Sequence, residues 1–536
     1  MRARNLVTGI AGAATLIAVL TVISRLLGFG RWLAQAATVQ ASAVGDAYGS
    51  ANLLPNVLYE VVAGGALAGA IIPLLAGPLA QKMATDVNRI ASALLTWALV
   101  GLVPVALALS LLARPIAEML PTSSGSDHGA QVELTTYFLI VFAPQVVLYG
   151  MGVVFTGILQ AHHRFLAPAL APIASTLVVI VSYFVFGFLA DGMQDQPGQL
   201  SDGALAWLAW GTTAGVAAMA LPLLIPVLRC GVRLRLTLRF PPGVAARARS
   251  LALAGLGALL AQQVSVVVVL LLARSGGQVG TINLFQWTQA VYLLPYAVLA
   301  VPLATAIFPR LAELATRRDR EPFARTAEKS TRAILSVSLA GVAGLVAVAP
   351  AVEQVFARWN DTDGMTLALT LMAPGVVGLS LIFHVSRVLY ALERNRAAVA
   401  ATATGWAAVS IACVIGVRAV AAGGGQGPAT LAALGLGHSI GMMVAAIALM
   451  AAFRRAVRLP VLHLARRTLL FGVAGTVLGG VIGRFAVDTV LDLAGVSILA
   501  AVLAGLLGGI LALSAVGGLT VAGDRSVVNV LRRARG

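Results

Sequence analysis

Two arginines stand inside the first long apolar stretch of the chain, in the segment SRLLGFGRW at residues 24–32. An arginine in a lipid-crossing helix is costly unless an anionic group compensates its charge. Arg25 and Arg31 are suited to bind a pyrophosphate or a carboxylate, because guanidinium groups form paired hydrogen bonds with such anions. The alternative is a structural ion pair with Asp46 or Glu60. Both interpretations hold together if the acids occupy the arginines while a cavity is empty.

The spacing of the two arginines raises a geometric question. Arg25 and Arg31 are six residues apart, which does not place them on one face of a straight helix. Gly28 and Gly30 lie between them. A bend at these glycines would direct both guanidinium groups into one cavity.

Other polar side chains inside apolar stretches are candidates to line the same cavity. The predicted substrate-binding set is Arg25, Arg31, Asp46, Asn52, Glu60, Gln286 and Gln289. We expect no catalytic residue and no metal ligand among them. For any single Asn or Gln, the alternative role is a hydrogen bond between helices.

The elements that must position these residues are membrane helices, because 59% of the 536 residues are hydrophobic, only 11% are charged and the mean hydropathy is +0.93. We predict an all-α polytopic membrane protein with fourteen transmembrane helices joined by short connections. The predicted stretches are 8–38, 47–78, 91–113, 134–159, 165–190, 204–228, 250–273, 281–309, 333–356, 366–391, 397–417, 428–452, 468–487 and 496–522.

The net charge of +17 follows this topology. If the N-terminus is cytoplasmic, most of the 37 Lys and Arg residues lie at the termini and in the even-numbered connections, which are then also cytoplasmic. This positive-inside pattern predicts that both termini are cytoplasmic. It also explains the positive charge without a nucleic-acid partner.

An internal repeat predicts how the helices are grouped. Residues 67–80 (LAGAIIPLLAGPLA) are identical to residues 303–316 (LATAIFPRLAELAT) at half of their positions. An even number of spans separates the two segments, so both run the same way through the membrane. We therefore predict two parallel-related six-helix lobes, at 1–229 and 245–453, that enclose a central cavity. The two helices of residues 466–523 lie outside the repeat.

Motifs for catalysis or nucleotide hydrolysis are missing from the sequence. It contains no G-x-x-x-x-G-K-[ST] loop, no H-E-x-x-H and no G-x-S-x-G, and Cys230 and Cys413 are far apart. We therefore expect a protein that is not an enzyme and has no cofactor. Energy for uphill transport would come from an ion gradient or from the membrane potential acting on charged groups.

The polar and repeated segments resemble the MurJ/MviN family of bacterial lipid II flippases, within the multidrug/oligosaccharidyl-lipid/polysaccharide exporter superfamily. The resemblance begins with SRLLGFGRW and continues with GDAYGSANLLPNVLYEVVAGGALAGAIIPLLA, QAHHRFLAPALAP, GALAWLAWGTTAGV and AIFPRLAEL. It covers essentially the whole chain, and the family also has fourteen spans.

The resemblance implies a flippase that moves lipid II from the cytoplasmic to the outer leaflet of the bacterial plasma (inner) membrane by alternating access. It implies that Arg25 and Arg31 hold the pyrophosphate of an undecaprenyl-pyrophosphate-linked substrate, and that Asp46 is a cavity carboxylate. It further implies that the helices of residues 466–523 form a groove for the polyprenyl tail. Membrane lipids and cell-wall synthesis proteins are the other partners that we expect.

The chain departs from the family pattern near the expected anion site. Many relatives have arginine after L-P-N-L-L, where this chain has Tyr59 followed by Glu60. Gly64 replaces an acid, and Ala290 stands near the position of another cavity arginine. The anion site therefore depends on two arginines where some relatives have more. Either the lipid is held differently, or the substrate differs, or activity depends on a partner.

Two other functions fit parts of the sequence. A drug/cation antiporter of the same superfamily would bind Na⁺ or H⁺ through Asp46 and Glu60, with twelve spans and a net negative cavity. A non-transporting scaffold would recruit wall-synthesis proteins through the basic connections 229–249 and 310–332. The positive-inside bias is the simpler explanation of those connections.

Overall fold

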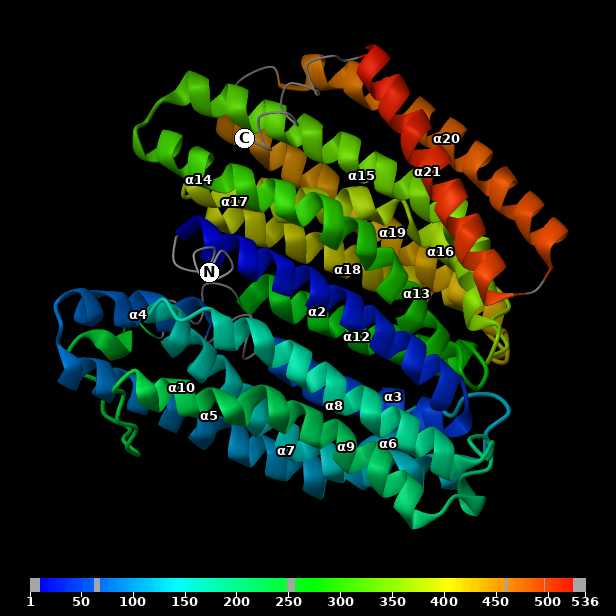
Figure 1. Ribbon diagram of the computed structural model, residues 1–536, viewed down its shortest axis with the longest axis horizontal. Coiled ribbons are helices and arrows are strands. Elements are labelled where there is room, and N and C mark those ends of the chain that lie inside the picture. The colour runs from blue at the N-terminus through cyan, green and yellow to red at the C-terminus, as the bar shows by residue number, and fades with distance from the viewer. Residues whose placement is uncertain are drawn as a thin grey trace, which may run out of the picture. The chain divides into compact units, whose positions relative to one another are not determined.

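A computed structural model describes residues 10–61, 68–246, 248, 256–457, 461–495 and 497–523 of the protein. These residues form helices and connecting segments, with no β-strand among them (Figure 1). The predicted all-α fold is confirmed. The chain divides into two compact units, Met1–Gln263 (unit 1) and Val264–Gly536 (unit 2).

Most of the predicted spans coincide with long apolar helices. Within the described residues, 11 helices are long and apolar enough to cross a membrane. The number rises to 12 candidate spans if the bent helix pair α16 (Met365–Met372) and α17 (Gly375–Ala391) is one span. The first two predicted stretches fall on α2 (Ile10–Thr38) and on α3 (Ala43–Glu60) with α4 (Ala68–Ala80). These helices are not among those 12, so the total of fourteen spans stays a prediction.

Unit 1 is a helical bundle organised around one central helix, α7. Besides α2, α3 and α4, its helices are α5 (Ala84–Leu111), α6 (Ala113–Met119), α7 (His128–Ala161), α8 (Leu166–Ala190), η2 (Pro197–Gln199), α9 (Asp202–Ala220), η3 (Leu221–Leu223) and α10 (Leu224–Arg229). The α7 helix packs against α3, α4, α5 and α9, whereas α2 packs along α8. Two-thirds of the apolar window of α7 is buried, against about a third or less for α5 and α8.

The sequence at the start of α3 explains both its first turn and its anchoring. The Ser42 hydroxyl accepts a hydrogen bond from the Gly45 N–H at 3.0 Å, which is a standard N-cap. Further along α3, the buried Tyr48 hydroxyl hydrogen-bonds Tyr183 of α8 at 2.9 Å and Thr212 of α9 at 3.0 Å. These contacts fix α3 within the bundle, because a buried hydroxyl without a partner would be costly.

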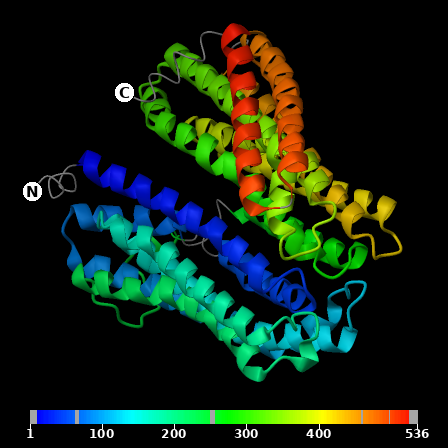
Figure 2. The same cartoon turned by 45° about the vertical axis from the view of Figure 1, so that its right-hand side comes forward.

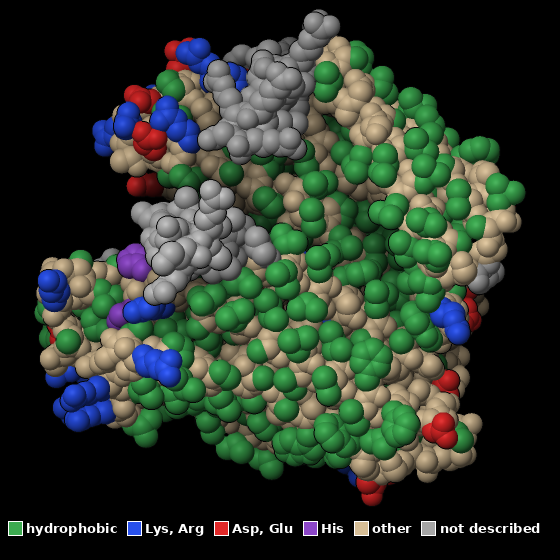
Figure 3. Space-filling model, in the orientation of Figure 1, with side chains coloured by type: hydrophobic (Ala, Val, Ile, Leu, Met, Phe, Trp, Pro, Cys, Tyr) green, Lys and Arg blue, Asp and Glu red, His purple; other side chains and the backbone are tan. Residues whose placement is uncertain are grey.

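Basic side chains of unit 1 gather at one end of its helices. That end carries the turn after α4, the connection from α7 to α8, and the end of α10 (Figure 3). Its exposed basic residues include Lys82, Arg164, Arg229, Arg233 and Arg235. Hydrophobic side chains cover the middle of the unit, as expected for a surface in contact with lipid.

Unit 2 packs its last two helices on one long buried helix, α15. The helices after the bundle of unit 1 are α12 (Leu256–Gly276), α13 (Thr281–Pro295), the π-helix η4 (Tyr296–Ala300), α14 (Val301–Thr316), α15 (Arg320–Phe356), α16, α17, α18 (Asn395–Val420), α19 (Gly427–Val457), α20 (Val461–Ala494) and α21 (Ile498–Gly523). Figures 1 and 2 show α20 and α21 side by side along α15. The repeated sequence motif falls on α4 and α14.

Glycines allow α20 and α21 to approach each other closely. A Cβ atom at Gly483 would lie 2.6 Å from the Gly508 carbonyl oxygen and 2.6 Å from the Ala347 Cβ of α15. A Cβ at Gly479 would lie 2.7 Å from the Ala512 carbonyl oxygen. Small residues let membrane helices pack backbone against backbone, which is the main source of helix association in lipid.

We expect Gly483→Leu to lower stability by about 1–3 kcal/mol, because the added side chain has no space between α20, α21 and α15. Thermal unfolding of the purified protein in detergent measures this. The matched control is Gly517→Leu in α21, where an added Cβ meets nothing within 4 Å. Equal shifts in melting temperature for the two variants would contradict the packing role of Gly483.

Candidate functional site

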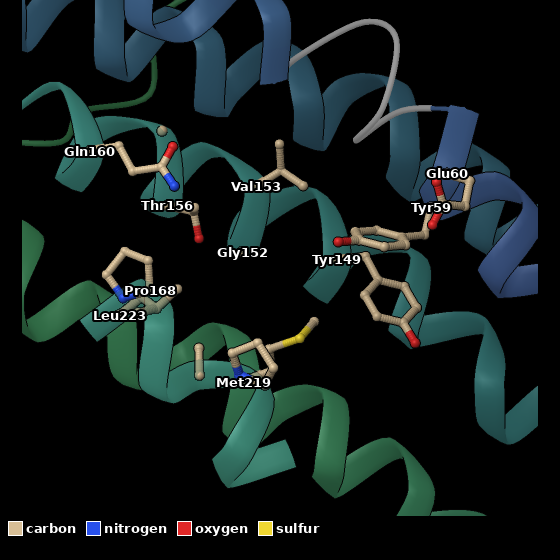
Figure 4. A pocket seen from close by; sticks show the side chains of 13 residues that line it. Tyr59, Glu60, Tyr149, Gly152, Val153, Thr156, Gln160, Pro168, Met219 and Leu223 are labelled. Atoms are coloured by element: carbon tan, nitrogen blue, oxygen red, sulfur yellow. The ribbon is translucent and has the colours of Figure 1, made fainter. Parts of the chain in front are cut away.

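A cavity of about 390 Å³ lies within unit 1, lined by α3, α7, α8, α9 and η3 (Figure 4). Its polar lining comes from Tyr59 and Glu60 at the end of α3 and from Thr156 and Gln160 in α7. The remaining lining is mostly apolar and includes Pro and Met side chains of α8 and α9. A mostly apolar wall with a few convergent polar groups is typical of a small-molecule or substrate site.

The last turns of α3 are positioned by a short hydrogen-bonded network with α7. The Tyr149 hydroxyl donates to the Asn56 side-chain oxygen at 3.0 Å, and the Asn56 amide donates to the Asn52 carbonyl at 2.8 Å. The rings of Tyr59 and Tyr149 pack with their centroids 4.4 Å apart. Because residues four apart share one helix face, Asn52, Asn56 and Glu60 all lie on the same side of α3.

Several polar groups of the cavity are available to a ligand. In Figure 4, the Tyr59 hydroxyl and the Gln160 amide point toward the cavity from opposite sides. Within the described part of the chain, the side chains of Tyr59, Glu60, Thr156 and Gln160 have no hydrogen-bond partner. This arrangement of hydroxyl, amide and carboxylate suits a ligand rich in hydroxyl and amide groups.

Arg31 does not line this cavity, although its charge acts on Tyr149, which does line it, and Arg25 lies in a different environment. Arg31 is half-buried, its guanidinium lies 4.8 Å from the centre of the Trp32 ring, and its charge interacts electrostatically with the hydroxyls of Tyr48 and Tyr149. Arg25 is exposed. Neither arginine forms an ion pair with any residue that the structure describes, so the alternative of a structural ion pair with Asp46 or Glu60 is not observed.

The α2 helix runs without interruption through Gly28 and Gly30. Six residues of α-helix separate Arg25 and Arg31 by about 9 Å along the axis and about 240° around it. A Cβ atom at either glycine would meet nothing within 4 Å, so neither glycine is required by packing.

Asp46 belongs to the scaffold at the opposite end of α3. Its side chain is fully buried, accepts a hydrogen bond from the Ser123 hydroxyl at 2.8 Å, and lies in the first turn of the helix. The positive end of the helix dipole stabilises a carboxylate there. Asp46 does not line the cavity, because fourteen helical residues, or about 21 Å, separate it from Glu60.

Gln286 and Gln289 lie in unit 2. Both are half-buried on α13, together with Ala290, and neither lines the cavity of unit 1. Gly64 lies outside the described residues.

Sequence reasoning missed the contribution of α7 to the cavity. Tyr149, Thr156 and Gln160 follow a spacing of seven and four residues, which places them on one helix face. That spacing was the available signal, but Tyr149 and Thr156 lie in the predicted apolar span 134–159, where single polar residues are common in helix packing, and Gln160 directly follows it.

Comparison with solved structures defines the class of the fold. The structure resembles one described as "Lipid II flippase MurJ, inward closed conformation", with a TM-score of 0.70 and 17% identity over 93% of this chain and 98% of that one. It also resembles an inward-facing multidrug resistance MATE family transporter of the MOP superfamily, with a TM-score of 0.65 and 16% identity over 81% of this chain and 94% of that one. The chain is therefore a multi-span membrane protein with the fold shared by MurJ and MATE transporters.

Sequence comparison identifies the family. The model of the family described as lipid II flippase MurJ matches residues 35–505. A relative from Bdellovibrio bacteriovorus named "Probable lipid II flippase MurJ" is 30% identical over 71% of each chain. One of the same name from Rhizobium tropici is 24% identical over 86% of this chain and 84% of its own. The chain belongs to the MurJ family, as the resemblance of its motifs predicts.

We expect the Asp46 carboxylate and the Ser123 hydroxyl to be energetically coupled. Asp46→Ala leaves a buried hydroxyl without its acceptor, at a cost of about 1–3 kcal/mol. The effects of Asp46→Ala and Ser123→Ala on thermal unfolding should therefore be less than additive in the double variant. Asp363→Ala, at an exposed loop position, serves as the control. Full additivity would contradict the assignment of Asp46 to the scaffold.

Proposed function

We propose that the protein moves the lipid-linked peptidoglycan precursor lipid II from the cytoplasmic to the outer leaflet of the bacterial plasma membrane by alternating access. Membership of the MurJ family supports this function. The observation that carries it is Arg31, a half-buried cation that acts on Tyr149 of the cavity wall and has no acidic partner among the described residues. Such a cation in a membrane protein calls for an anionic ligand.

The chemistry of the site matches the parts of this substrate. The Arg31 guanidinium is suited to bind the pyrophosphate, since it presents donors in a planar fork that fits phosphate oxygens. Tyr59, Thr156 and Gln160 offer hydrogen bonds to the sugar and peptide groups of the headgroup. The cavity is small, so it receives a portion of the headgroup.

The positions of Arg25 and Arg31 suit two successive contacts with the pyrophosphate better than simultaneous binding of the pyrophosphate by both side chains. Their separation along and around α2 is too large for one compact anion to contact both while the helix is straight. With the N-terminus cytoplasmic, Arg25 lies nearer the leaflet from which the substrate enters. Arg31 then receives the pyrophosphate deeper in the protein.

Further parts of the proposal concern the lipid tail, the energy source and the partners. The last two helices, α20 and α21, supply an exposed apolar surface for the polyprenyl tail that includes Val477, Val481, Phe485, Leu506 and Ile510. Transport is driven by an ion gradient or the membrane potential, with no cofactor and no catalysis by this chain. Cell-wall synthesis proteins are the proposed partners, before and after the transport of lipid II.

Glu60 favours one alternative function, a cation-coupled antiporter. Its carboxylate lines the cavity without a partner in the described residues, and the fold is shared with a MATE transporter. A carboxylate in such a position is suited to bind a proton or Na⁺.

Replacing Arg31 tests the flippase function. We expect Arg31→Ala to slow the outward display of lipid II about ten-fold or more in cells depleted of their native flippase, because a charge-assisted contact is lost. Arg31→Lys should restore part of the activity, since it keeps the charge and loses the fork. The control is Arg114→Ala, an exposed arginine paired with Glu118 at 3.0 Å. Unchanged growth and display with Arg31→Ala would refute the anion site.

Replacing Glu60 separates the two functions. We expect Glu60→Gln to retain lipid II display, since the amide keeps the size and hydrogen-bonding capacity of the side chain. An antiporter that uses Glu60 would instead lose cation-dependent drug efflux with the same variant. Both activities are measured in reconstituted vesicles, with and without a Na⁺ or proton gradient. Drug efflux by the native protein that Glu60→Gln abolishes, with no lipid II display by either protein, would favour the antiporter.

A further inference from the structure

A basic segment that follows α10 adopts an extended conformation along the start of α5. Its sequence, VRLRLTLRF at residues 232–240, alternates leucine with arginine or threonine over most of its length. We refer to residues 232–240 as the strap.

A ladder of hydrogen bonds holds the strap against α5. The backbone N–H groups of Arg233, Arg235 and Thr237 donate to the side chains of Asn88, Ser92 and Thr96 at 2.9, 3.0 and 3.0 Å. The Trp97 indole N–H then donates to the Leu238 carbonyl at 3.0 Å. The paired residues are two apart on the strap and four apart on the helix.

The two spacings match because of simple geometry. Two residues of extended chain span about 6.6 Å, and four residues of α-helix rise about 6 Å. An extended segment therefore stays in register with every fourth helical residue. The ladder satisfies backbone groups that would otherwise be costly at the edge of an apolar membrane.

The strap turns one set of side chains inward and exposes another. Val232 is buried, and Leu234 and Phe240 pack against the hydrophobic core of unit 1. The outward set is both basic and apolar, with Leu236 81% exposed and Leu238 51% exposed. The exposed arginines of the strap are Arg233, Arg235 and Arg239.

The helix face that carries the strap continues as a lipid-facing stripe. Beyond the ladder, α5 exposes Trp97, Val100, Leu107 and Leu111, and α5 is itself a candidate membrane span. The strap thus lies where the polar end of a spanning helix meets its apolar surface. Tryptophan and arginine are the residues that favour this boundary, with the ring and the aliphatic stem in the apolar layer.

We propose that the strap binds the phosphate groups of anionic phospholipids in the leaflet on the arginine-rich side of unit 1. Charge complementarity supports this occupant, because none of the three arginines forms an ion pair with a described residue. The exposed leucines beside them fit acyl chains, which a soluble acidic partner does not offer. The proposal is independent of the transported substrate.

Quenching of Trp97 by brominated lipids tests the proposal. The full-length protein is reconstituted in phosphatidylcholine bilayers containing phosphatidylglycerol, with bromine on one lipid or the other. Subtracting the signal of Trp97→Phe isolates Trp97 from the other six tryptophans of the seven in the chain. We expect brominated phosphatidylglycerol to quench Trp97 about five-fold more than brominated phosphatidylcholine at equal mole fraction, as one dominant arginine contact implies.

The variant Arg233→Gln/Arg235→Gln/Arg239→Gln should bring the two lipids to equal quenching. The matched control removes the same charge from exposed positions of unit 2, with Arg320→Gln/Arg394→Gln/Arg396→Gln, and should keep the preference. If the first variant fails to fold, raising the salt concentration with the native protein should reduce the preference toward equality.

Three results would overturn the proposal. The first is equal quenching by both lipids in the native protein, which would leave the arginines to a soluble acidic partner. The second is a preference that survives loss of all three arginines. The third is a preference that does not respond to salt.

Discussion

The structure depends on the cost of polar groups in an apolar surrounding, where each donor, acceptor or charge needs a partner. Most polar groups of unit 1 meet this requirement internally. Tyr48 bonds two neighbouring helices, and Tyr149 positions Asn56. Against this background, the polar side chains that lack a partner among the described residues indicate where a ligand enters. In unit 1, Tyr59, Glu60, Thr156 and Gln160 are such side chains and line the cavity. Buried oxygens of Gln35, Thr136 and Gln145 also lack a partner and lie outside the cavity lining.

The presence or absence of a hydrogen-bond partner distinguishes residues of the same type. Asp46 and Glu60 are both acids in α3, and both were candidates for the cavity. Asp46 is buried, bonded to Ser123 and placed at the positive end of the helix dipole, so the fold itself uses its charge. Glu60 lies at the other end of the helix, lines the cavity and has no described partner. Position along the helix, and not residue type, decides between scaffold and site.

The fold was predictable because apolar length and the distribution of basic residues are properties of the linear chain. The cost of charges in a membrane helix selected Glu60, which lines the cavity, and Arg31, which does not line it and whose role as an anion site stays a prediction. Tyr149 and Gln160 could not be selected, since nothing in a single sequence shows which face of α7 meets α3. The strap could not be predicted for another reason. In the sequence, RLRLTLR is typical of a basic connection between helices, and only the structure shows that its spacing matches that of Asn88, Ser92 and Thr96.

One physical rule applies to both Arg31 and the arginines of the strap, because a charge beside apolar surface needs a compensating group. Near the surface, arginines are tolerated because their stems lie along apolar atoms while their charges reach phosphates and water. In unit 1, Arg31 is half-buried, and the groups near it are the hydroxyls of Tyr48 and Tyr149 and the Trp32 ring. Neutral groups and a ring face stabilise a cation only in part, so the charge stays available. In the function that we propose, the pyrophosphate of the substrate would compensate this charge, which a neutral or cationic drug would not do.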